Sequence, residues 1–452
     1  MSFPRYPEYK DSGVEWLGEV PAHWIITKLN RIVQTDRPIT YGIVQAGPHV
    51  PDGIPYVRPA DMSEEDGVRS QDDVLRTSAE VASAYIRSTI KTDDLVCSIG
   101  PSFGKVMVTP AWLDGANLTQ GTARIAVAAP NSLRYVFWVL RSGFATAQWE
   151  SSIGGATFRA LNLGPLAATV LVLPPPNEQA TIAAFLDRET AKIDELVGEQ
   201  QRLIELLKEK RETVISHAVT KGLNPDAPMK PSGFEWLGEV PAHWAVLPLK
   251  RLIADDTSIS YGIVQPGESL DAGVPFIQTT NMSSGKFDVD SLQKTSAEIA
   301  GAYPRSALSG GEVILGIRAS IGAAHVVPMT LAGANLSRGV ARIVPGPSLM
   351  NRYLVAYFGT AAVMWYWELS KQGSTFNEVS IATVRDLAVC VPPVDEQAVI
   401  VKHLDVELNR FDALIIEAQR AIELLQERRT ALISAAVTGQ IDVRAIAGKA
   451  AA

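Results

Sequence analysis

Two pairs of matched positions in this chain exchange arginine for an amide side chain. Arg58 in the stretch YVRPADMSE aligns with Gln278 in FIQTTNMSS, and Arg159 in SIGGATFRAL aligns with Asn377 in KQGSTFNEV. Arginine donates paired hydrogen bonds to a guanine edge, whereas asparagine and glutamine pair with adenine. The exchanges therefore predict contacts with the edges of nucleobases. Drift at a solvent-exposed surface is the alternative interpretation.

Other loops carry side chains suited to hydrogen bonding with bases or phosphates. The stretch YGIVQ occurs twice and offers an aromatic ring and an amide beside a flexible glycine, although a structural turn explains it equally well. The Gly-rich stretches SIGPSFGKV and GIRASIGAA hold one cation each, and their backbone could approach a phosphate. They lack the Walker spacing, so no nucleotide site is predicted. The further candidates are Tyr41, Gln45, Lys105, Thr157, Tyr261, Gln265, Asn281, Arg318 and Thr375.

These positions can be matched because the chain repeats itself after about half its length. Residues 12–24 read SGVEWLGEVPAHW and residues 232–244 read SGFEWLGEVPAHW. The blocks YGIVQ, TSAE, GANL, ARI and IELL recur in the same order. Short solenoid repeats recur every ~20–50 residues. The pattern instead predicts a tandem duplication of a whole unit.

Each half combines two kinds of sequence. Residues 1–175 and 223–391 are rich in Gly, Pro and short β-branched runs, which predicts a compact α+β domain in each. Residues 176–222 and 392–440 carry apolar residues at steps of 3 and 4, typical of a coiled-coil helix, and 441–452 form a tail. The predicted seam residues are Leu186, Ile193, Leu196, Leu203, Leu207, Leu404, Phe411, Leu414, Leu425 and Leu432.

The two helices are the simplest partners for each other's apolar seams. Each would span about 60 Å at ~1.5 Å per residue, and an exposed leucine seam of that length is unfavourable. We therefore expect an α+β fold with two inverted globular domains joined by two long antiparallel coiled-coil helices, pseudo-twofold because of the internal repeat. Paired domains on a helical spacer suit duplex DNA, whose local dyads allow two half-sites at a fixed separation.

The bulk properties are those of a reduced, multidomain cytoplasmic protein. The 452 residues exceed what one hydrophobic core supports and predict two to four domains. No apolar run is long enough to cross a membrane, and the N-terminus lacks the apolar core of a signal peptide. Cys97 and Cys390 provide neither a disulfide framework nor a zinc site. His23 and His243 have no second ligand at metal spacing, so no metal is expected.

The repeated motifs resemble those of a known family. SGVEWLGEVPAHW, a variable domain and LPPPNEQATIAAFLDRETAKIDELVGEQQRLIELLKEKRETVISHAVTKG follow one another as in the specificity subunit of Type I restriction-modification systems. The second half repeats this order with VPPVDEQAVIVKHLDVELNRFDALIIEAQRAIELLQERRTALISAAVTGQID. The resemblance covers essentially the whole chain.

The resemblance implies a non-catalytic DNA-binding role within a larger complex. Each globular domain would be a target recognition domain that reads one half of a bipartite double-stranded target. The helices would set the spacing and dock two methyltransferase subunits for adenine methylation. Two restriction subunits would add motor and nuclease activity for cleavage of unmodified DNA, in defence against foreign DNA. This subunit would bind no cofactor, because S-adenosylmethionine, ATP and Mg are used by its partners.

The charge of the chain predicts weak DNA binding by this subunit alone. The formal net charge is −8 and the pI is about 5.4. Residues 1–175 hold 15 Lys+Arg and 17 Asp+Glu, giving −2, and residues 229–391 hold 12 and 13, giving −1. The globular domains are therefore nearly neutral, whereas most DNA-binding domains are basic. Partner subunits would have to supply much of the phosphate contact.

Two other functions compete with this interpretation. A pure interaction scaffold, with helices presenting two protein-binding domains, agrees with the composition and the charge. An enzyme in its own right is disfavoured, because the sequence contains no P-loop, no methyltransferase-like Gly-rich motif with an aromatic catalytic tetrapeptide, and no carboxylate–lysine cluster of a nuclease. A narrower variant keeps the DNA-reading role in a methylation-only system without a nuclease partner.

Overall fold

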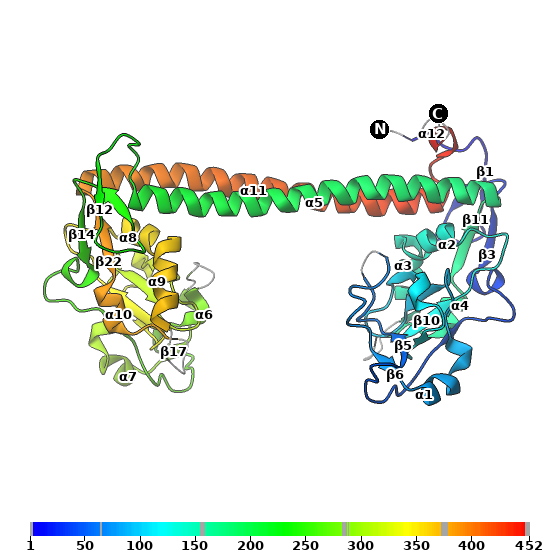
Figure 1. Ribbon diagram of the computed structural model, residues 1–452, viewed down its shortest axis with the longest axis horizontal. Coiled ribbons are helices and arrows are strands. Elements are labelled where there is room, and N and C mark those ends of the chain that lie inside the picture. Colours follow the sequence, from blue (N-terminus) through cyan, green and yellow to red (C-terminus); the bar gives the residue numbers. More distant parts are fainter. Residues whose placement is uncertain are drawn as a thin grey trace. The chain divides into compact units, whose positions relative to one another are not determined.

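The structure is a computed structural model that divides into two compact units (Figure 1). Unit 1 contains residues 1–200 and 420–452, and unit 2 contains residues 201–419. Each unit therefore joins one globular domain to parts of both long helices. The domain boundaries proposed from the sequence divide the chain differently and stay a prediction. The described residues are 3–63, 66–153, 159–282, 287, 289–371 and 378–447.

Unit 1 is built from short strands and mostly short helices. Its strands are β1 (Tyr9–Asp11), β2 (Glu19–Pro21), β3 (Ile25–Lys28), β4 (Thr40–Tyr41), β5 (Ile54–Val57), β6 (Arg76–Thr77), β7 (Leu95–Ser98), β8 (Val106–Val108), β9 (Asn117–Leu118), β10 (Thr122–Ile125) and β11 (Val170–Leu173). Its helices are α1 (Ala79–Ala84), α2 (Leu133–Leu140), α3 (Gly143–Ile153), α4 (Leu163–Ala167), the first part of α5 (Pro176–Thr220), and α12 (Arg444–Ala447).

Unit 2 repeats this series of elements. Its strands are β12 (Met229–Pro231), β13 (Glu239–Pro241), β14 (Ala245–Pro248), β15 (Ser260–Tyr261), β16 (Val274–Ile277), β17 (Lys294–Thr295), β18 (Val313–Gly316), β19 (Ala324–Val326), β20 (Asn335–Leu336), β21 (Val340–Ile343) and β22 (Ala388–Val391). Its helices are α6 (Thr279–Met282), α7 (Ala297–Gly301), α8 (Asn351–Phe358), α9 (Ala361–Lys371), α10 (Ile381–Asp386) and most of α11 (Val394–Val437).

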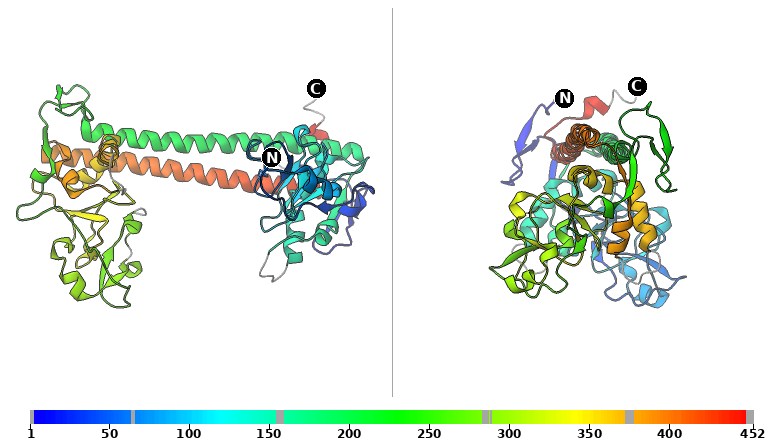
Figure 2. Two further views of the ribbon diagram at one scale, coloured as in Figure 1. Left: turned by 60° about the horizontal axis from the view of Figure 1, so that its bottom comes forward. Right: turned by 90° about the vertical axis from the view of Figure 1, so that its left-hand side faces the viewer.

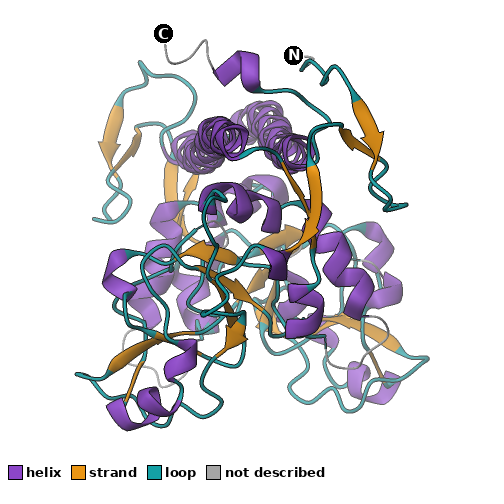
Figure 3. Ribbon diagram, turned by 90° about the vertical axis from the view of Figure 1, so that its right-hand side faces the viewer, coloured by secondary structure: helices purple, strands orange, loops and turns teal. Residues whose placement is uncertain are grey.

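The sheets of the two units have the same strand orders. A four-stranded sheet runs β4-β10-β7-β8 in unit 1 and β15-β21-β18-β19 in unit 2. A three-stranded sheet runs β6-β5-β9 and β17-β16-β20, with the last pair parallel in each. The hairpins β1-β2 and β12-β13 and the pairs β11-β3 and β14-β22 complete both sets. Figure 3 shows these short strands among the helices and loops. The predicted α+β class and internal repeat are confirmed.

The main core of each unit lies where the globular domain meets the long helices. In unit 1, Trp24, Tyr135 and Trp149 are buried in one cluster with Ile182 of α5 and Ala436 of α11. The unit 2 cluster contains the corresponding residues Trp244, Tyr353 and Trp367 together with residues from both long helices. A second, smaller cluster lies beneath the three-stranded sheet of each unit. The helices are therefore part of the hydrophobic core of each unit.

The two long helices run antiparallel where they meet in each unit (Figures 1 and 2). In unit 1, Arg429 Nε of α11 donates to Asp194 Oδ1 of α5 at 2.8 Å. In unit 2 the matching residues, Arg211 of α5 and Asp412 of α11, form an ion pair at 3.6 Å. Within each unit, the colours of the two ribbons follow the sequence in opposite directions (Figure 1). This agrees with the antiparallel pairing predicted from the apolar seams.

The long helices begin close to the start of the predicted segments. α5 begins at Pro176, where proline is tolerated because the first turn needs no amide hydrogen. α11 begins at Val394, one residue before Asp395. α2 and α3 are two separate helices, and Ser132 caps the start of α2 by accepting from the Tyr135 amide.

Both cysteine thiols are protected by burial. The burial of Cys97 and Cys390 raises the pKa of each thiol to about 12. An exposed thiol has a pKa near ~8.5, so at pH 8 we expect roughly three orders of magnitude less thiolate in the folded chain. Labelling with a thiol reagent should be negligible in the native protein and complete in guanidinium. Rapid labelling of either cysteine without denaturant would contradict this.

The same burial predicts the sign of a pH effect on stability. A thiol whose pKa is raised in the folded state contributes fully below its unfolded pKa of ~8.5. This contribution is lost as the pH rises from there towards about 12. The free energy of unfolding should therefore decrease above pH ~9, and replacing each cysteine by Ala should reduce that decrease.

Candidate nucleic-acid interface and its anchors

The first YGIVQ loop separates into a structural half and an exposed half. A Cβ atom added at Gly42 would lie 1.9 Å from the carbonyl oxygen of Leu118, so no other residue fits without a backbone shift. The Ile43 amide donates to the same oxygen at 2.7 Å. The Tyr41 side chain, by contrast, is 46% exposed, and Gln45 is also exposed. The glycine and isoleucine fix the loop, and the tyrosine and glutamine face solvent.

The second YGIVQ loop has the same geometry. A Cβ at Gly262 would lie 1.8 Å from the Leu336 carbonyl oxygen. Tyr261 is 45% exposed, and Gln265 is also exposed. The glycine of each motif therefore serves as a structural turn, and the tyrosine and glutamine remain available for contact with a partner. The Tyr and Gln pairs are placed where an external partner could reach them.

The aligned pair Arg58 and Gln278 lies at the end of matching strands, β5 and β16. The Asp61 carboxylate accepts from the Arg58 amide at 2.8 Å and from its Nε at 3.0 Å. The hydrogen bond with Asp61 raises the pKa of the Arg58 guanidinium. In unit 2, Asn281 Oδ1 accepts from the Gln278 amide at 2.9 Å. Asp61 and Asn281 thus close the same turn, and Asp61 also holds the arginine that precedes it.

Lys105 lines a polar cleft with two further cations in unit 1. The cleft has a volume of about 510 Å³ and is lined by Arg69, Lys105 and Arg141 together with the Ser102 and Gly104 loop. Lys105 Nζ donates to a backbone carbonyl oxygen, that of Met62, at 3.4 Å. Three cations around one hollow suit a phosphate oxygen. Arg69 and Arg141 were missed in the sequence because only the structure brings them to Lys105.

Arg318, the counterpart cation in unit 2, has an acidic partner. Its Nε donates to Glu378 Oε2 at 2.7 Å, and Arg338 lies 3.8 Å from the same oxygen. In unit 1, Arg159 pairs with Glu150. A phosphate would have to compete with these carboxylates. The candidates Thr157, Thr375 and Asn377 lie outside the described residues.

The repeated hairpin segment is anchored to the start of α5 by one carboxylate. Tyr6 Oη donates to Glu178 Oε1 at 2.7 Å, and Trp24 Nε1 donates to the same oxygen at 3.2 Å. His23 Nε2 lies 2.9 Å from Glu178 Oε2. The Glu178 side chain is only 6% exposed. The repeated HW and EQ motifs, far apart in sequence, therefore form one contact.

Unit 2 contains the same anchor in a more exposed form. Trp244 Nε1 donates to Glu396 Oε1 at 3.1 Å, and His243 Nε2 lies 2.8 Å from Glu396 Oε2. The position of Tyr6 is taken by Asp226, and the Glu396 side chain is 31% exposed. His23 and His243 are thus partners of a carboxylate. The described residues include no group of histidine, cysteine or acidic side chains that could hold a metal ion.

The glutamine after each of these glutamates ties the domain to the helix. Gln179 Nε2 donates to the Pro174 carbonyl oxygen at 2.9 Å, and its Oε1 accepts from the Ser132 amide at 2.8 Å. Gln397 repeats both contacts, with Pro392 and with the Met350 amide. Each glutamine therefore joins the end of a strand, the start of a long helix, and the start of α2 or α8.

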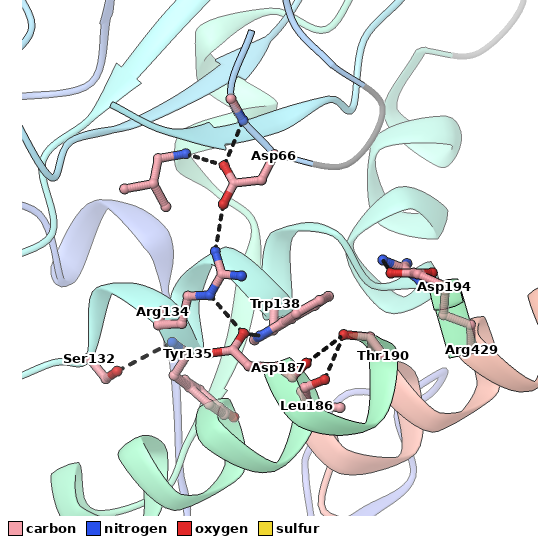
Figure 4. Close-up of polar contacts among 12 residues, drawn as sticks. Asp66, Ser132, Arg134, Tyr135, Trp138, Leu186, Asp187, Thr190, Asp194 and Arg429 are labelled. Atoms are coloured by element: carbon pink, nitrogen blue, oxygen red, sulfur yellow. Dashed lines mark hydrogen bonds and ion pairs between the residues drawn. The ribbon is translucent and has the colours of Figure 1, made fainter. Parts of the chain in front are cut away.

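A second network joins the segment that follows β5 in unit 1 to α5 (Figure 4). Arg134 of α2 donates to Asp187 of α5 at 2.8 Å and to Asp66, beyond β5, at 2.7 Å. Trp138 Nε1 donates to Asp187 Oδ1 at 2.8 Å. In unit 2, Arg352 and Asp405 form the matching pair. These contacts couple the position of Asp66 to α5.

The helix seam is formed by only part of the predicted set. Leu186, Ile193, Leu404, Phe411 and Leu432 are buried, and Leu207 and Leu425 are half-buried. The structure places Leu196, Leu203 and Leu414 in solvent, at 43%, 43% and 45% exposure.

The seam of α5 instead follows Ile193, Val197 and Ile204. Ile204 is 7% exposed, and Val197 packs against the unit 1 core. Leu196 immediately precedes Val197 in the sequence, and Leu203 immediately precedes Ile204. One position is a rotation of ~100° around an α-helix, which turns their side chains away from the partner helix.

These contacts define a class of protein with two matching globular domains. Equivalent residues anchor each domain to a pair of antiparallel helices. The family described as "Type I restriction modification DNA specificity domain" matches residues 266–426. Residues 266–426 therefore carry a domain of this family, and most of the chain is similar to specificity subunits of Type I restriction-modification systems.

Individual relatives match most of the chain. The Type I restriction enzyme EcoBI specificity subunit of Escherichia coli is 23% identical over 398 residues, which is 86% of this chain and 80% of that protein. A chain from a solved structure on complex assembly and conformational transition of the type I R-M system aligns with a TM-score of 0.71 at 19% identity, covering 93% of this chain and 99% of its own. The HsdS subunit from Thermoanaerobacter tengcongensis aligns with a TM-score of 0.52 at 18% identity, covering 93% and 98%. None of the described helices is long and apolar enough to span a membrane.

Proposed function

We propose that each unit reads one half of a bipartite duplex DNA target, and that the two long helices fix the separation of the half-sites. The observation that carries this proposal is the matched pair of anchored domains. Both present an exposed tyrosine and glutamine from the same loop, yet they differ at Arg58 and Gln278. Equivalent anchors with different neighbouring side chains suit two half-sites of different sequence.

The contacts divide between bases and phosphates. The exposed amides Gln45 and Gln265 suit adenine edges, and Tyr41 and Tyr261 offer apolar surface beside them. The cleft of Arg69, Lys105 and Arg141 suits the DNA backbone. Several arginines already have acidic partners, which favours weak binding by this subunit alone. Partner subunits would then supply much of the electrostatic attraction.

The partners in this proposal are two methyltransferase subunits and, for restriction, two motor-nuclease subunits. The equivalence of the two units supports two copies of one methyltransferase partner. The methyltransferase subunits use S-adenosylmethionine, and the nuclease subunits use ATP and Mg, whereas this chain holds no cofactor. The complex would act on DNA in the cytoplasm.

Mapping adenine methylation across host DNA tests the proposal. With the methyltransferase subunit present, deletion of this chain should remove methylation from one bipartite motif. Restoring the chain with Gln45→Ala should weaken or relax one half of the motif by roughly 10–100-fold, and Gln265→Ala should affect the other half. Asp226→Ala, at an exposed position outside the recognition loops, is the matched control and should restore the motif unchanged.

Each other result has a clear meaning. Unchanged methylation on deletion would favour the scaffold function instead. If Gln45→Ala and Gln265→Ala both affected the same half-site, the assignment of one unit to each half would be wrong. Methylation without cleavage of unmodified DNA would indicate a methylation-only system.

A further inference from the structure

The tips of the two hairpins are nearly identical in sequence, and the fold does not explain all of the shared residues. Twelve of the thirteen residues in 12–24 and 232–244 are identical. The structure explains many of them locally. Ser12 closes the turn by bonding to Val14 at 3.1 Å, Gly13 and Gly18 have φ of 69° and 68°, and Trp24 is buried. Those residues are constrained by the fold itself.

Three side chains at each tip make no polar contact with the fold. Glu15, Trp16 and Glu19 are exposed in unit 1, with Trp16 at 54%. Their side chains form no hydrogen bond or ion pair with any described residue. The counterparts are Glu235, Trp236 and Glu239, and the two glutamates are again exposed. Each half therefore places a tryptophan between two exposed glutamates at its hairpin, where Trp16 is exposed and Trp236 is half-buried.

Each indole is supported by the helix behind it. The Trp16 ring centroid lies 5.2 Å from that of Phe144 in α3. The Trp236 ring centroid lies 5.4 Å from that of Tyr366 in α9. Phe144 and Tyr366 do not occupy matching positions in the repeat, since Tyr366 aligns with Gln148. The equivalent tryptophans Trp16 and Trp236 are thus packed against aromatic residues at different positions of the repeat.

The surface around each indole is apolar but differs in shape. In unit 1, Trp16 borders a cleft of about 760 Å³ that is also lined by Ala147, Ser151 and Pro165. In unit 2 the positions of Ala147 and Ser151 hold Trp365 and Leu369, which are 50% and 43% exposed. What the two surfaces share is the indole and its two carboxylates. A partner that binds both units would recognise this shared part.

We propose that each hairpin tip docks one methyltransferase subunit. Trp16 or Trp236 enters an apolar pocket of that partner, and the flanking glutamates pair with lysine or arginine side chains around the pocket. The loops that face DNA can diverge because two half-sites differ. A surface that binds two copies of the same subunit stays the same in both halves. This inference rests on the proposed function, in which one partner binds twice.

The experiment uses the full chain with purified methyltransferase subunit. Native mass spectrometry counts the bound subunits, and titration gives their affinities. We expect two bound subunits for the unaltered chain. Trp16→Ala or Trp236→Ala should each weaken one of them by roughly 30-fold, and the double variant should weaken both. The control is Trp112→Ala, since Trp112 is 37% exposed and its matching position holds Thr330.

Charge reversal gives a second test that does not remove packing. Glu15→Lys with Glu19→Lys should weaken one bound subunit, more so at low salt. Two tightly bound subunits on both the double tryptophan variant and the charge-reversed variant would overturn the inference and leave the proposed function standing. No binding by the folded, unaltered chain would overturn both. A double variant that binds two subunits but methylates neither half-site would mean that the tips contact DNA instead.

Discussion

Gly42→Ala should destabilise unit 1 by about 3 kcal/mol, although it adds a single methyl group. The new Cβ would lie 1.9 Å from the Leu118 carbonyl oxygen, which belongs to β9 and accepts the Ile43 amide. The clash is with backbone, so no side chain can rotate away from it. The loop and β9 must separate, and the exposed Tyr41 and Gln45 move with the loop. Recognition of the unit 1 half-site should therefore be lost as well.

The same substitution elsewhere should have the opposite sign. Gly198 lies in α5 with no atom within 4 Å of an added Cβ, so Gly198→Ala should stabilise by about 1 kcal/mol through helix propensity. Thermal and denaturant unfolding measure both changes, and hydrogen exchange localises them to one unit. Methylation mapping reports the half-site. A Gly42→Ala variant with unchanged stability and an unchanged motif would show that the loop tolerates a shift of β9.

The repeat made much of the fold predictable from sequence alone. Periodicity located α5 and α11 to within a few residues, because a 45-residue and a 44-residue helix leave a long apolar pattern. The nearly constant spacing between repeated motifs also predicted which loops of the two halves correspond, such as those of Gln45 and Gln265. The interhelix pair Asp194–Arg429 could have been found in the same way, because its counterpart Arg211–Asp412 recurs at the same offset.

Long-range polar contacts were less predictable. Nothing local shows that His23 and Trp24 meet Glu178, because 154 residues separate Trp24 from that carboxylate. Arg58 looked like a base-reading side chain in sequence, and the structure shows that Asp61, three residues later, already holds it. The seam error at Leu196 and Leu203 has a similar origin. Leucines recur at two nearby phases of α5, and packing against α11 selects only one of them.

Glu178→Ala should destabilise the protein by about 3 kcal/mol, and Glu396→Ala by only about 1 kcal/mol. Both glutamates lie at the start of a long helix, and each accepts a hydrogen bond from a tryptophan of the hairpin segment. Glu178 is 6% exposed and also accepts from Tyr6, whereas Glu396 is 31% exposed and has no tyrosine at that position. Burial and the neighbouring Glu178 carboxylate raise the pKa of Tyr6, so its hydroxyl stays a donor at neutral pH. Removing Glu178 leaves two buried donors without an acceptor, and water can replace much of what Glu396 provides.

Tyr6→Phe combined with Glu178→Ala separates the two donors. If the unsatisfied Tyr6 hydroxyl causes part of the loss, the double variant should be more stable than Glu178→Ala alone, since phenylalanine needs no acceptor. Glu178→Gln is the conservative control and should retain part of the stability by accepting through its amide oxygen. Urea unfolding followed by the fluorescence of the nine tryptophans measures the stability, and hydrogen exchange assigns each change to a unit. Equal losses for Glu178→Ala and Glu396→Ala would show that the indole contact alone anchors each hairpin and that Tyr6 contributes nothing.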